Sequence, residues 1–282
     1  MRPQAKGLLV TFLGVALMSV EAPLIRLAQT PAITIGFYFG LFIMLSTQSI
    51  LLSRGVEAWK KSFTTQPKGA LLAGLCMGLG NFFFIQAVSH GGIANTVLIL
   101  ASAPVVSALL ALLILKERTP FHIYIAAVFV FLGLYIIVAE GFQGGTLKGN
   151  VYALLVVLCL SFLFIVLTFY KKTSRIAFVF FGGFFVSLLC GLGFSFAITW
   201  DGLFFVGLMG LIITPLSRIL IGMGTRYLIP AQMGLLIIAE SILAPFWGWW
   251  WLGEIPTSAT LLGGSIILGA IGFNALATLK RP

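Results

Sequence analysis

The sequence predicts an all-α integral membrane protein with ten transmembrane helices arranged as two inverted five-helix repeats. The 282-residue chain is 60% hydrophobic and only 9% charged, with a mean hydropathy of +1.13, whereas soluble domains are about 25% charged. Ten apolar runs have the length, about 18 to 25 residues, at which a helix crosses a bilayer. The third observation is an internal repeat, which divides the chain into two similar halves.

The repeat is carried by two long segments that align without a gap. When Ala94 is superposed on Ala231, Glu117 falls on Glu254. Each segment reads as a long apolar helix, a short L-x-E turn and a further apolar helix. A Lys-Gly pair opens the first apolar run of each half, so each half reads as one five-helix unit. The two units are expected at residues 1–141 and 142–282.

The ten expected helices follow one another with short loops. They are predicted near residues 7–28, 32–53, 68–89, 93–115, 120–139, 149–169, 176–198, 203–224, 230–252 and 257–279. The longest connection runs from Arg54 to Pro67, which leaves no room for a soluble domain. Glycines four residues apart, at Gly36 and Gly40 and at Gly74 and Gly78, predict close packing between helices.

The distribution of Lys and Arg predicts the orientation in the cell (inner) membrane. If the N-terminus is inside, the outer loops hold only Arg26 and Lys148. The cytoplasmic side then holds Arg2, Lys6, Arg54, Lys60, Lys61, Lys68, Lys116, Arg118, Lys171, Lys172, Arg175, Arg226, Lys280 and Arg281. This asymmetry predicts that both termini are cytoplasmic. Five helices per unit is an odd number, so the second unit is inverted relative to the first, as in alternating-access carriers.

Composition and motifs argue against several other classes. The net charge of +10 would suit a nucleic-acid partner, but no basic run exceeds two residues, so we expect no nucleic acid and assign the excess to short cytoplasmic loops. Cys76, Cys159 and Cys190 each stand alone in a different apolar run, without metal or redox spacing. We expect no metal, no cofactor and no catalytic residue. The chain lacks G-x-x-x-x-G-K-[ST], so transport would draw on a gradient, an exchange or a partner.

Pro104 and Pro245 fall near the middle of the fourth and ninth expected helices. A proline there removes a backbone donor and clashes with the carbonyl four residues earlier, which would free the carbonyls of Leu100 and Ser241. Two interpretations stay open: a fixed kink, and a hinge beside a cavity. Both prolines are therefore candidate hinges.

Charged residues also lie inside the expected helices, where a charge at the helix centre costs at least ~2.5–3.5 kcal/mol. Glu240 is near the centre of the ninth helix and shares a face with Trp247. The alternatives are a protonated, hydrogen-bonded carboxyl and a cation or proton site. Arg218 either extends to the cytoplasmic interface or binds a carboxylate in a cavity. The repeat offset places Asn81 at the matching position of the first half, which favours a cavity.

Glu21 lies in the outer half of the first helix, just before Pro23. It either pairs with a basic group such as Arg26 or takes part in transport. Tyr38 is a weaker candidate, because a lone polar residue in a helical bundle is usually satisfied by a neighbour. The candidate substrate-binding residues are Glu240, Arg218, Trp247, Glu21, Asn81 and Tyr38.

Several stretches carry a family resemblance and together span nearly the whole chain. They are Ser19 to Ala28, the small-residue start of the fourth helix at Ala94, Pro104 with Leu115-Lys116-Glu117, and Glu240 to Glu254 with its L-G-E. Through two copies at the right spacing, the chain resembles the EamA family of the drug/metabolite transporter superfamily. The resemblance implies secondary transport of small metabolites, most often the export of amino acids or related compounds.

The repeat, the central prolines and the buried charges together predict a secondary transporter of small polar or amphipathic metabolites that works by alternating access. An uptake or exchange carrier for a cationic or quaternary-amine metabolite is the alternative. A membrane enzyme would need paired carboxylates, a His-rich site or metal ligands, and His90 and His122 are the only histidines. A channel is a further class, which saturation of flux in liposomes separates from a carrier. The expected partners are a small-molecule substrate, the lipid bilayer and a coupled proton or counter-substrate, in a monomer or a homodimer.

Overall fold

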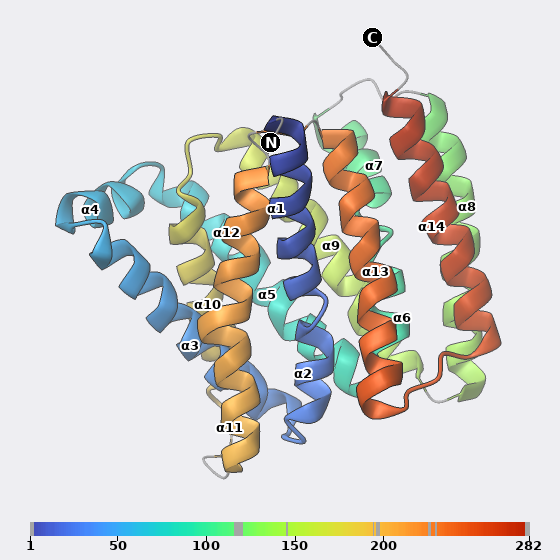
Figure 1. Ribbon diagram of the computed structural model, residues 1–282, viewed down its shortest axis with the longest axis horizontal. Coiled ribbons are helices and arrows are strands. Elements are labelled where there is room, and N and C mark those ends of the chain that lie inside the picture. The colour runs from blue at the N-terminus through green and yellow to red at the C-terminus, as the bar shows by residue number, and fades with distance from the viewer. Residues whose placement is uncertain are drawn as a thin grey trace.

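The computed structural model describes residues 3–115, 121–144, 146–193, 195, 198–224, 227–228 and 230–279. Within these residues all regular structure is helical (Figure 1). Some residues discussed above lie outside this described part of the chain: Arg2, Lys116, Glu117, Arg118, Arg226, Lys280 and Arg281.

Long apolar runs form the helices, because a helix satisfies its backbone N–H and C=O groups within its own segment when no water is present. The first half holds α1 (Pro3–Met18), α2 (Glu21–Leu27), α3 (Ala32–Ser53), α4 (Val56–Thr64), α5 (Pro67–Gly91), α6 (Ile93–Leu100), α7 (Ala103–Leu115) and α8 (Phe121–Gly144). The second half holds α9 (Leu147–Phe169), α10 (Arg175–Cys190), α11 (Trp200–Gly207), the π-helix η1 (Leu208–Ile213), α12 (Thr214–Gly224), α13 (Pro230–Leu252) and α14 (Ser258–Leu279).

Eight segments of the described residues are long and apolar enough to cross a membrane. They are Gly7–Leu27, Ala32–Ser53, Pro67–Gly91, Ile93–Ile114, Phe121–Phe142, Leu147–Phe169, Trp200–Ile221 and Ser258–Ala277. The chain is therefore an all-α, multi-pass membrane protein. The count of ten spans, the division at residue 141 and the inversion of the second unit stay predictions.

The start of α1 and the end of α14 lie at the same end of the bundle (Figure 1). We call this the termini end, and α4 lies toward it. The opposite end, called the far end below, holds the connections α2–α3, α5–α6 and α13–α14 (Figure 1). Each cavity described below belongs to one of these two ends.

The most extensive helix contacts join the first half of the chain to the second. They pair α5 with α9 and α10, α3 with α10, α8 with α14, and α1 with α12. Small residues allow these approaches: a Cβ on Gly133 would lie 2.6 Å from the carbonyl oxygen of Gly263, and one on Gly263 would lie 2.7 Å from that of Gly133. In lipid, the hydrophobic effect does not drive helices together, so close backbone packing supplies much of the favourable free energy of helix association.

The two glycine pairs singled out from the sequence both face α10. A Cβ on Gly36 would meet Cys190, and one on Gly40 would meet Gly183 and Ser187. Gly74 and Gly78 would meet Phe181 and Phe185 of the same helix. The prediction of close helix packing at these pairs is thus confirmed, and α10 is the helix that both pairs contact.

The connection from Arg54 to Pro67 was expected to be a loop, and this is wrong. It contains α4, which is amphipathic and carries exposed Lys60 and Lys61. Its aromatic side packs inward, because the ring of Phe63 lies 5.4 Å from that of Phe180 in α10. Aromatic and Lys side chains on opposite faces are typical of a helix that lies in the membrane interface.

The helix expected over 176–198 ends earlier, at Cys190. The sequence there continues Gly191-Leu192-Gly193, and glycine is a poor helix former. The first, fourth and eighth expected spans are interrupted, at Ser19–Val20, at Ala101–Ser102 and at η1. A proline follows each interruption within a few residues: Pro23, Pro104 and Pro215.

Candidate substrate site and the two cavities

Two interrupted spans face each other in the middle of the bundle and create a polar site. In the eighth span, Pro215 has no N–H to offer the carbonyl of Leu211 four residues earlier. The Oγ of Ser46 in α3 donates a hydrogen bond of 2.9 Å to that carbonyl instead. This substitute donor lets the backbone depart from an α-helix at η1 inside the membrane, where a free carbonyl would be costly.

Thr214, the residue between η1 and Pro215, binds Glu21 across the two halves of the chain. Its Oγ1 donates a hydrogen bond of 2.8 Å to Oε1 of Glu21. Both side chains are buried. Glu21 was expected either to pair with an outer basic group such as Arg26 or to act in transport, and Arg26 is not its partner, because Arg26 forms an ion pair with Glu254.

Three ionisable side chains interact electrostatically at this level: Glu21, Arg218 and Glu240, called the central triad below. Glu240 interacts electrostatically with both Glu21 and Arg218, and Glu21 interacts with Arg218. The Nε of Arg218 is buried and has no hydrogen-bond partner among the described residues. When all three groups are ionised, the triad has two negative carboxylates and one positive guanidinium, so it carries one net negative charge.

Trp247 lies about two helical turns after Glu240, on the same face of α13. Its Nε1 donates a hydrogen bond of 3.0 Å to Oγ of Ser19, at the break between α1 and α2. Ser19 in turn donates to the carbonyl of Ala16 at 2.7 Å. The indole therefore ties α13 to the broken first span, and its ring stacks on Trp251 at 5.1 Å.

The other predicted site residues, Tyr38 and Asn81, lie on α3 and α5. Tyr38 packs edge-on against Phe37, with 5.5 Å between ring centroids, and joins the apolar core. Asn81 is half-buried, and its Nδ2 has no hydrogen-bond partner among the described residues. Glu21, Arg218 and Glu240 thus interact electrostatically, and the roles of all the predicted site residues stay predictions.

A cavity of about 230 Å³ opens toward the termini end, and we call it the termini-end cavity. It lies between α3, α10 and α12. α3 contacts η1 and α11 more than it contacts α12. Its lining includes three arginines: Arg54 directly after α3, Arg175 in α10 and Arg218 in α12.

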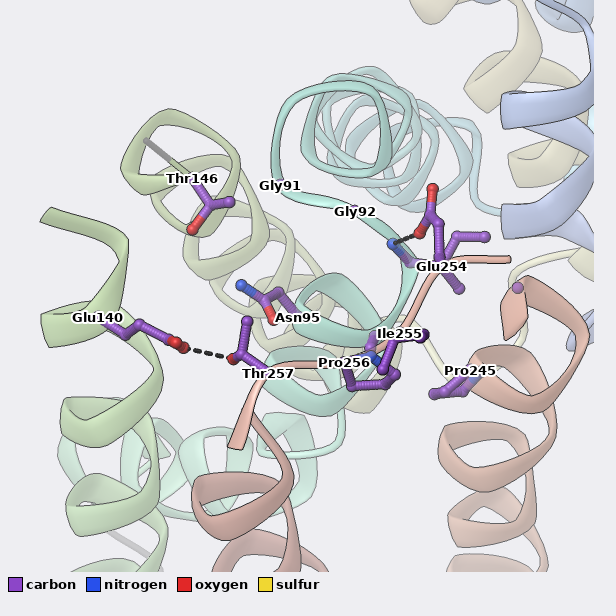
Figure 2. A pocket seen from close by; sticks show the side chains of 13 residues that line it. Gly91, Gly92, Asn95, Glu140, Thr146, Pro245, Glu254, Ile255, Pro256 and Thr257 are labelled. Carbon is purple, nitrogen blue, oxygen red and sulfur yellow. Dashed lines mark hydrogen bonds between the residues drawn. The ribbon is translucent and has the colours of Figure 1, made fainter. Parts of the chain in front are cut away.

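A second cavity, of about 220 Å³, lies at the far end and is called the far-end cavity (Figure 2). Its polar side chains include Glu140, Glu254, Asn95 and Thr257, and Pro245 contributes to the wall. Figure 2 shows Glu140 and Thr257 reaching toward each other across the space between α8 and the α13–α14 connection. The Oγ1 of Thr257 donates to Oε2 of Glu140 at 2.6 Å.

Two glycines set the geometry of Glu254 at this cavity. Gly253 has φ +67° and Gly92 has φ +82°, conformations that side chains rarely adopt. Gly253 ends α13, with the N–H of Glu254 bonded to the carbonyl of Gly248 at 3.2 Å. Gly92 precedes α6 and presents the N–H of Ile93, which donates to Oε2 of Glu254 at 3.2 Å.

Glu254 also accepts a hydrogen bond from Nε of Arg26 at 2.6 Å. We call Arg26, Glu254 and the Ile93 N–H the far-end latch. A carboxylate at the start of a helix is stabilised by the exposed N–H groups there. Further bonds between the halves lie beside it: Thr260 donates to Asn95 at 2.5 Å, and Asn95 donates to Asn150 at 3.3 Å. Polar contacts therefore join the two halves at the far end.

The two candidate hinges have different surroundings. Pro104 is the second residue of α7, just after the break at Ala101–Ser102, and its ring is exposed. Pro245 lies inside the continuous helix α13 and lines the far-end cavity. Ser241, four residues before it, donates from Oγ to the carbonyl of Val97 in α6 at 3.5 Å. Both prolines lie near the middle of their spans, as expected, but the helix is continuous only at Pro245, because the span of Pro104 is broken just before it.

Sequence reasoning missed Thr214, Ser19, Ser46 and the cross-half pair of Arg26 with Glu254. A signal existed for the first three, because Pro215 stands in the middle of the eighth expected span and Pro23 in the first. A proline inside a span predicts polar side chains that satisfy the freed backbone. The pair of Arg26 with Glu254 joins residues 228 positions apart and left no local signal.

Comparisons with known proteins agree with this architecture. The sequence profile of the EamA-like transporter family matches residues 5–139. The uncharacterized transporter YdfC of Bacillus subtilis (strain 168) is 28% identical over 200 residues, which are 67% of this chain and 64% of the relative, so the match spans less than two thirds of that protein. A crystal structure of a protein superposes on 99% of this chain and 100% of its own, with a TM-score of 0.66 and 16% identity, a likeness that shows the fold alone.

Proposed function

We propose that this chain belongs to the EamA-like transporter family, whose profile matches residues 5–139, and that it is a secondary transporter of small amphipathic metabolites such as amino acids. The observation that carries the proposal is the central triad. A zwitterion would place its carboxylate on the guanidinium of Arg218, which can bind it bidentately. Its ammonium group, or a coupled proton, would compensate the second negative charge of Glu21 and Glu240. Trp247, Asn81 and Tyr38 are the further candidate contacts.

The proposed mechanism is alternating access with export as its direction. The positive-inside rule supports a cytoplasmic termini end, because Arg54, Lys60, Lys61, Lys68, Lys171, Lys172 and Arg175 flank helix ends there, whereas Arg26 and Lys148 flank the far end. The far-end latch then closes the outer side while the termini-end cavity faces the cytoplasm. Transport requires the latch to open as the opposite cavity closes. We assign no catalytic role to any residue, and the unit is a monomer or a homodimer.

Counterflow of radiolabelled amino acids in liposomes tests this function with two substitutions in the triad. Glu240→Gln keeps the shape and the hydrogen-bonding capacity of the side chain while it removes the charge, so we expect loss of the pH dependence of exchange or a fall in affinity. Arg218→Lys replaces a planar fork by a point charge, so we expect a rate at least roughly tenfold lower. Glu57→Gln, on the exposed face of α4, is the matched control and should exchange at the wild-type rate.

Wild-type rates and pH dependence in both triad variants would remove the triad from the mechanism. Saturation of wild-type flux with substrate would distinguish a carrier from a channel. The runner-up function is uptake or exchange of a cationic or quaternary-amine metabolite, and the acidic lining of the far-end cavity favours it. Competition by a quaternary amine at the far side, with no competition by amino acids, would replace the first function by the second.

A further inference from the structure

We propose that the termini-end cavity is the loading site for an amphipathic anion, a small molecule that carries a carboxylate beside an apolar chain. The inference rests on the proposed function, because it names the substrate class and the first binding position of the same transporter. It concerns Arg54 and Arg175, two residues that lie outside the central triad.

The charge of the lining is of one sign. Arg54, Arg175 and Arg218 approach the cavity from α3, α10 and α12, and no acidic side chain is among the described residues that line it. None of the three forms an ion pair within the described part of the chain. A cavity with apolar walls and one sign of charge concentrates the field and raises the local concentration of counter-ions. The site therefore attracts anions and repels cations.

The start of α10 adds to this field. Arg175 and Ile176 are its first two residues, and both line the cavity. Ser174 caps the helix by accepting the N–H of Ala177 at 3.4 Å. The other N–H groups of the first turn keep their partial positive charge, which favours an anion at this position.

The remaining wall fits an apolar chain. Ile50, Ile176, Val179, Ile219 and Met223 line the cavity between the arginines. A volume of about 230 Å³ is below the ~300–1,000 Å³ of pockets for drug-sized ligands. A ligand that fills this space thus combines a carboxylate with a short hydrocarbon chain.

Arg218 connects this cavity to the central triad. It lines the cavity and interacts electrostatically with Glu21 and Glu240, while its buried Nε has no partner among the described residues. A carboxylate held first by Arg54 and Arg175 at the mouth can therefore pass to Arg218 without losing a guanidinium partner. An amine on the same molecule would then lie toward the two acids.

The phosphate of an anionic lipid has related chemistry, and basic residues at a cytoplasmic interface attract it. The two ligands, a soluble carboxylate and the headgroup of an anionic lipid, differ in size and in the need for a bilayer. A soluble carboxylate binds in neutral detergent, whereas a lipid headgroup requires that lipid to be supplied. The experiment therefore has one arm for each source.

Thermal unfolding of the purified full-length protein in neutral detergent is measured with three probes, because a ligand that binds the folded state raises its apparent stability. The first probe, 4-methylpentanoate, has a carboxylate and an apolar chain. The second, isopentylamine, has the apolar chain and an amine, and the third, acetate, has a carboxylate without the chain. We expect stabilisation by 4-methylpentanoate alone. Arg54→Gln and Arg175→Gln should each weaken its binding roughly tenfold, as the loss of a charge-assisted bond predicts.

Lys60→Gln is the matched control, since it removes one positive charge from the same end without touching the cavity. It should change the affinity by less than about twofold, because exposed charges outside the site are screened by salt. The second arm uses nanodiscs of phosphatidylcholine with or without phosphatidylglycerol. The affinity for 4-methylpentanoate should be the same in both, within about twofold.

Three results would overturn the proposal. The first is equal or tighter binding of isopentylamine, and the second is undiminished binding of 4-methylpentanoate to both arginine variants. The third is an arginine-dependent effect that requires phosphatidylglycerol and is absent for the carboxylate, which would assign the cavity to lipid. Wild-type counterflow is read separately, so a failed loading site and a failed transport function give different patterns.

Discussion

The two cavities of this protein are nearly equal in volume and opposite in charge. The termini-end cavity has three arginines in its lining and the far-end cavity has two glutamates. They also differ in how the halves of the chain meet. Hydrogen bonds and an ion pair join the halves around the far-end cavity, whereas α3 and α12 make only sparse contact beside the termini-end cavity. Each end therefore has its own chemistry.

For the proposed alternating-access cycle, this difference indicates how the far end can open. The ion pair of Arg26 with Glu254 is partly exposed, with 38% and 26% of the two side chains accessible. Pairs of that kind contribute about 0–1 kcal/mol each, so closure rests on several weak contacts and not on one strong one. Weak contacts of this kind are ones that a ligand can shift through a difference in its affinity for two states.

The largest expected effect is all-or-none labelling of an introduced cysteine, which tests which end faces the cytoplasm. In a variant whose Cys76, Cys159 and Cys190 are replaced by Ala, we introduce Ile255→Cys at the far end or Lys172→Cys at the termini end. Both positions are exposed. An impermeant thiol reagent added to intact cells should label the cysteine at 255 and leave the one at 172 unmodified until the membrane is permeabilised. The opposite pattern would reverse the comparison and the proposed direction of transport.

The next effect, about tenfold, concerns the far-end latch. Glu254→Gln removes the charge that holds Arg26 and weakens the bond to the Ile93 N–H. A loss of ~1.4 kcal/mol from the closed state corresponds to a tenfold shift of the equilibrium. We expect a cysteine introduced at Ala94, in the far-end cavity, to react about ten times faster in this variant.

Asp201→Asn is the control for the latch, because Asp201 is an exposed acid on α11 outside the far-end cavity. It should leave the reaction rate of the cysteine at 94 unchanged. The charge-swapped pair Arg26→Glu with Glu254→Arg should restore part of the protection, since the ion pair returns but the acceptor for Ile93 does not. Equal rates in wild type and Glu254→Gln would show that the latch does not keep the far end closed.

A smaller effect is expected from the hydrogen bond of Thr214 to Glu21, which lies between the two cavities. Thr214→Val keeps the shape of the side chain but removes the donor to Glu21, and both partners are buried. A buried polar group that loses its partner costs about 1–3 kcal/mol, so the melting temperature should fall. Thr168→Val is the control, because its exposed hydroxyl bonds only the carbonyl of Phe164 in its own helix. Equal melting of both variants would mean that the Glu21 bond adds nothing to stability.

The long spans could be predicted from the sequence because hydrocarbon imposes one dominant constraint. A run of apolar residues in lipid must be helical, and its length follows from the thickness of the bilayer. The lone charges were visible for the same reason, since Glu21, Arg218 and Glu240 stand out against an apolar background. Their meeting in one triad fits the reasoning that a buried charge needs a partner.

The sequence did not reveal which residues meet across the two halves. Glu254 was placed at the outer side, but its pairing with Arg26 depends on the packing of α2 against α13 and on the turns at Gly92 and Gly253. The amphipathic helix α4 was missed because it is short and only weakly apolar, so a search for spans passes over it. The bond of Ser46 to Leu211 required the register of α3 against η1, which no local pattern sets.

The smallest expected effect concerns the two prolines, which differ in their position within a helix and in their distance from a cavity. Pro245 removes a backbone bond inside α13 and lines the far-end cavity, so α13 can bend there when that end opens. Pro245→Ala restores a possible bond to the carbonyl of Ser241 and stiffens the helix. We expect normal expression and a turnover about threefold lower in counterflow, which corresponds to ~0.7 kcal/mol on the barrier.

Pro104→Ala is the comparison, because proline at the start of a helix removes no intrahelical bond. Its turnover should match the wild type, and a reduction as large as that of Pro245→Ala would show that the hinge does not depend on the far-end cavity.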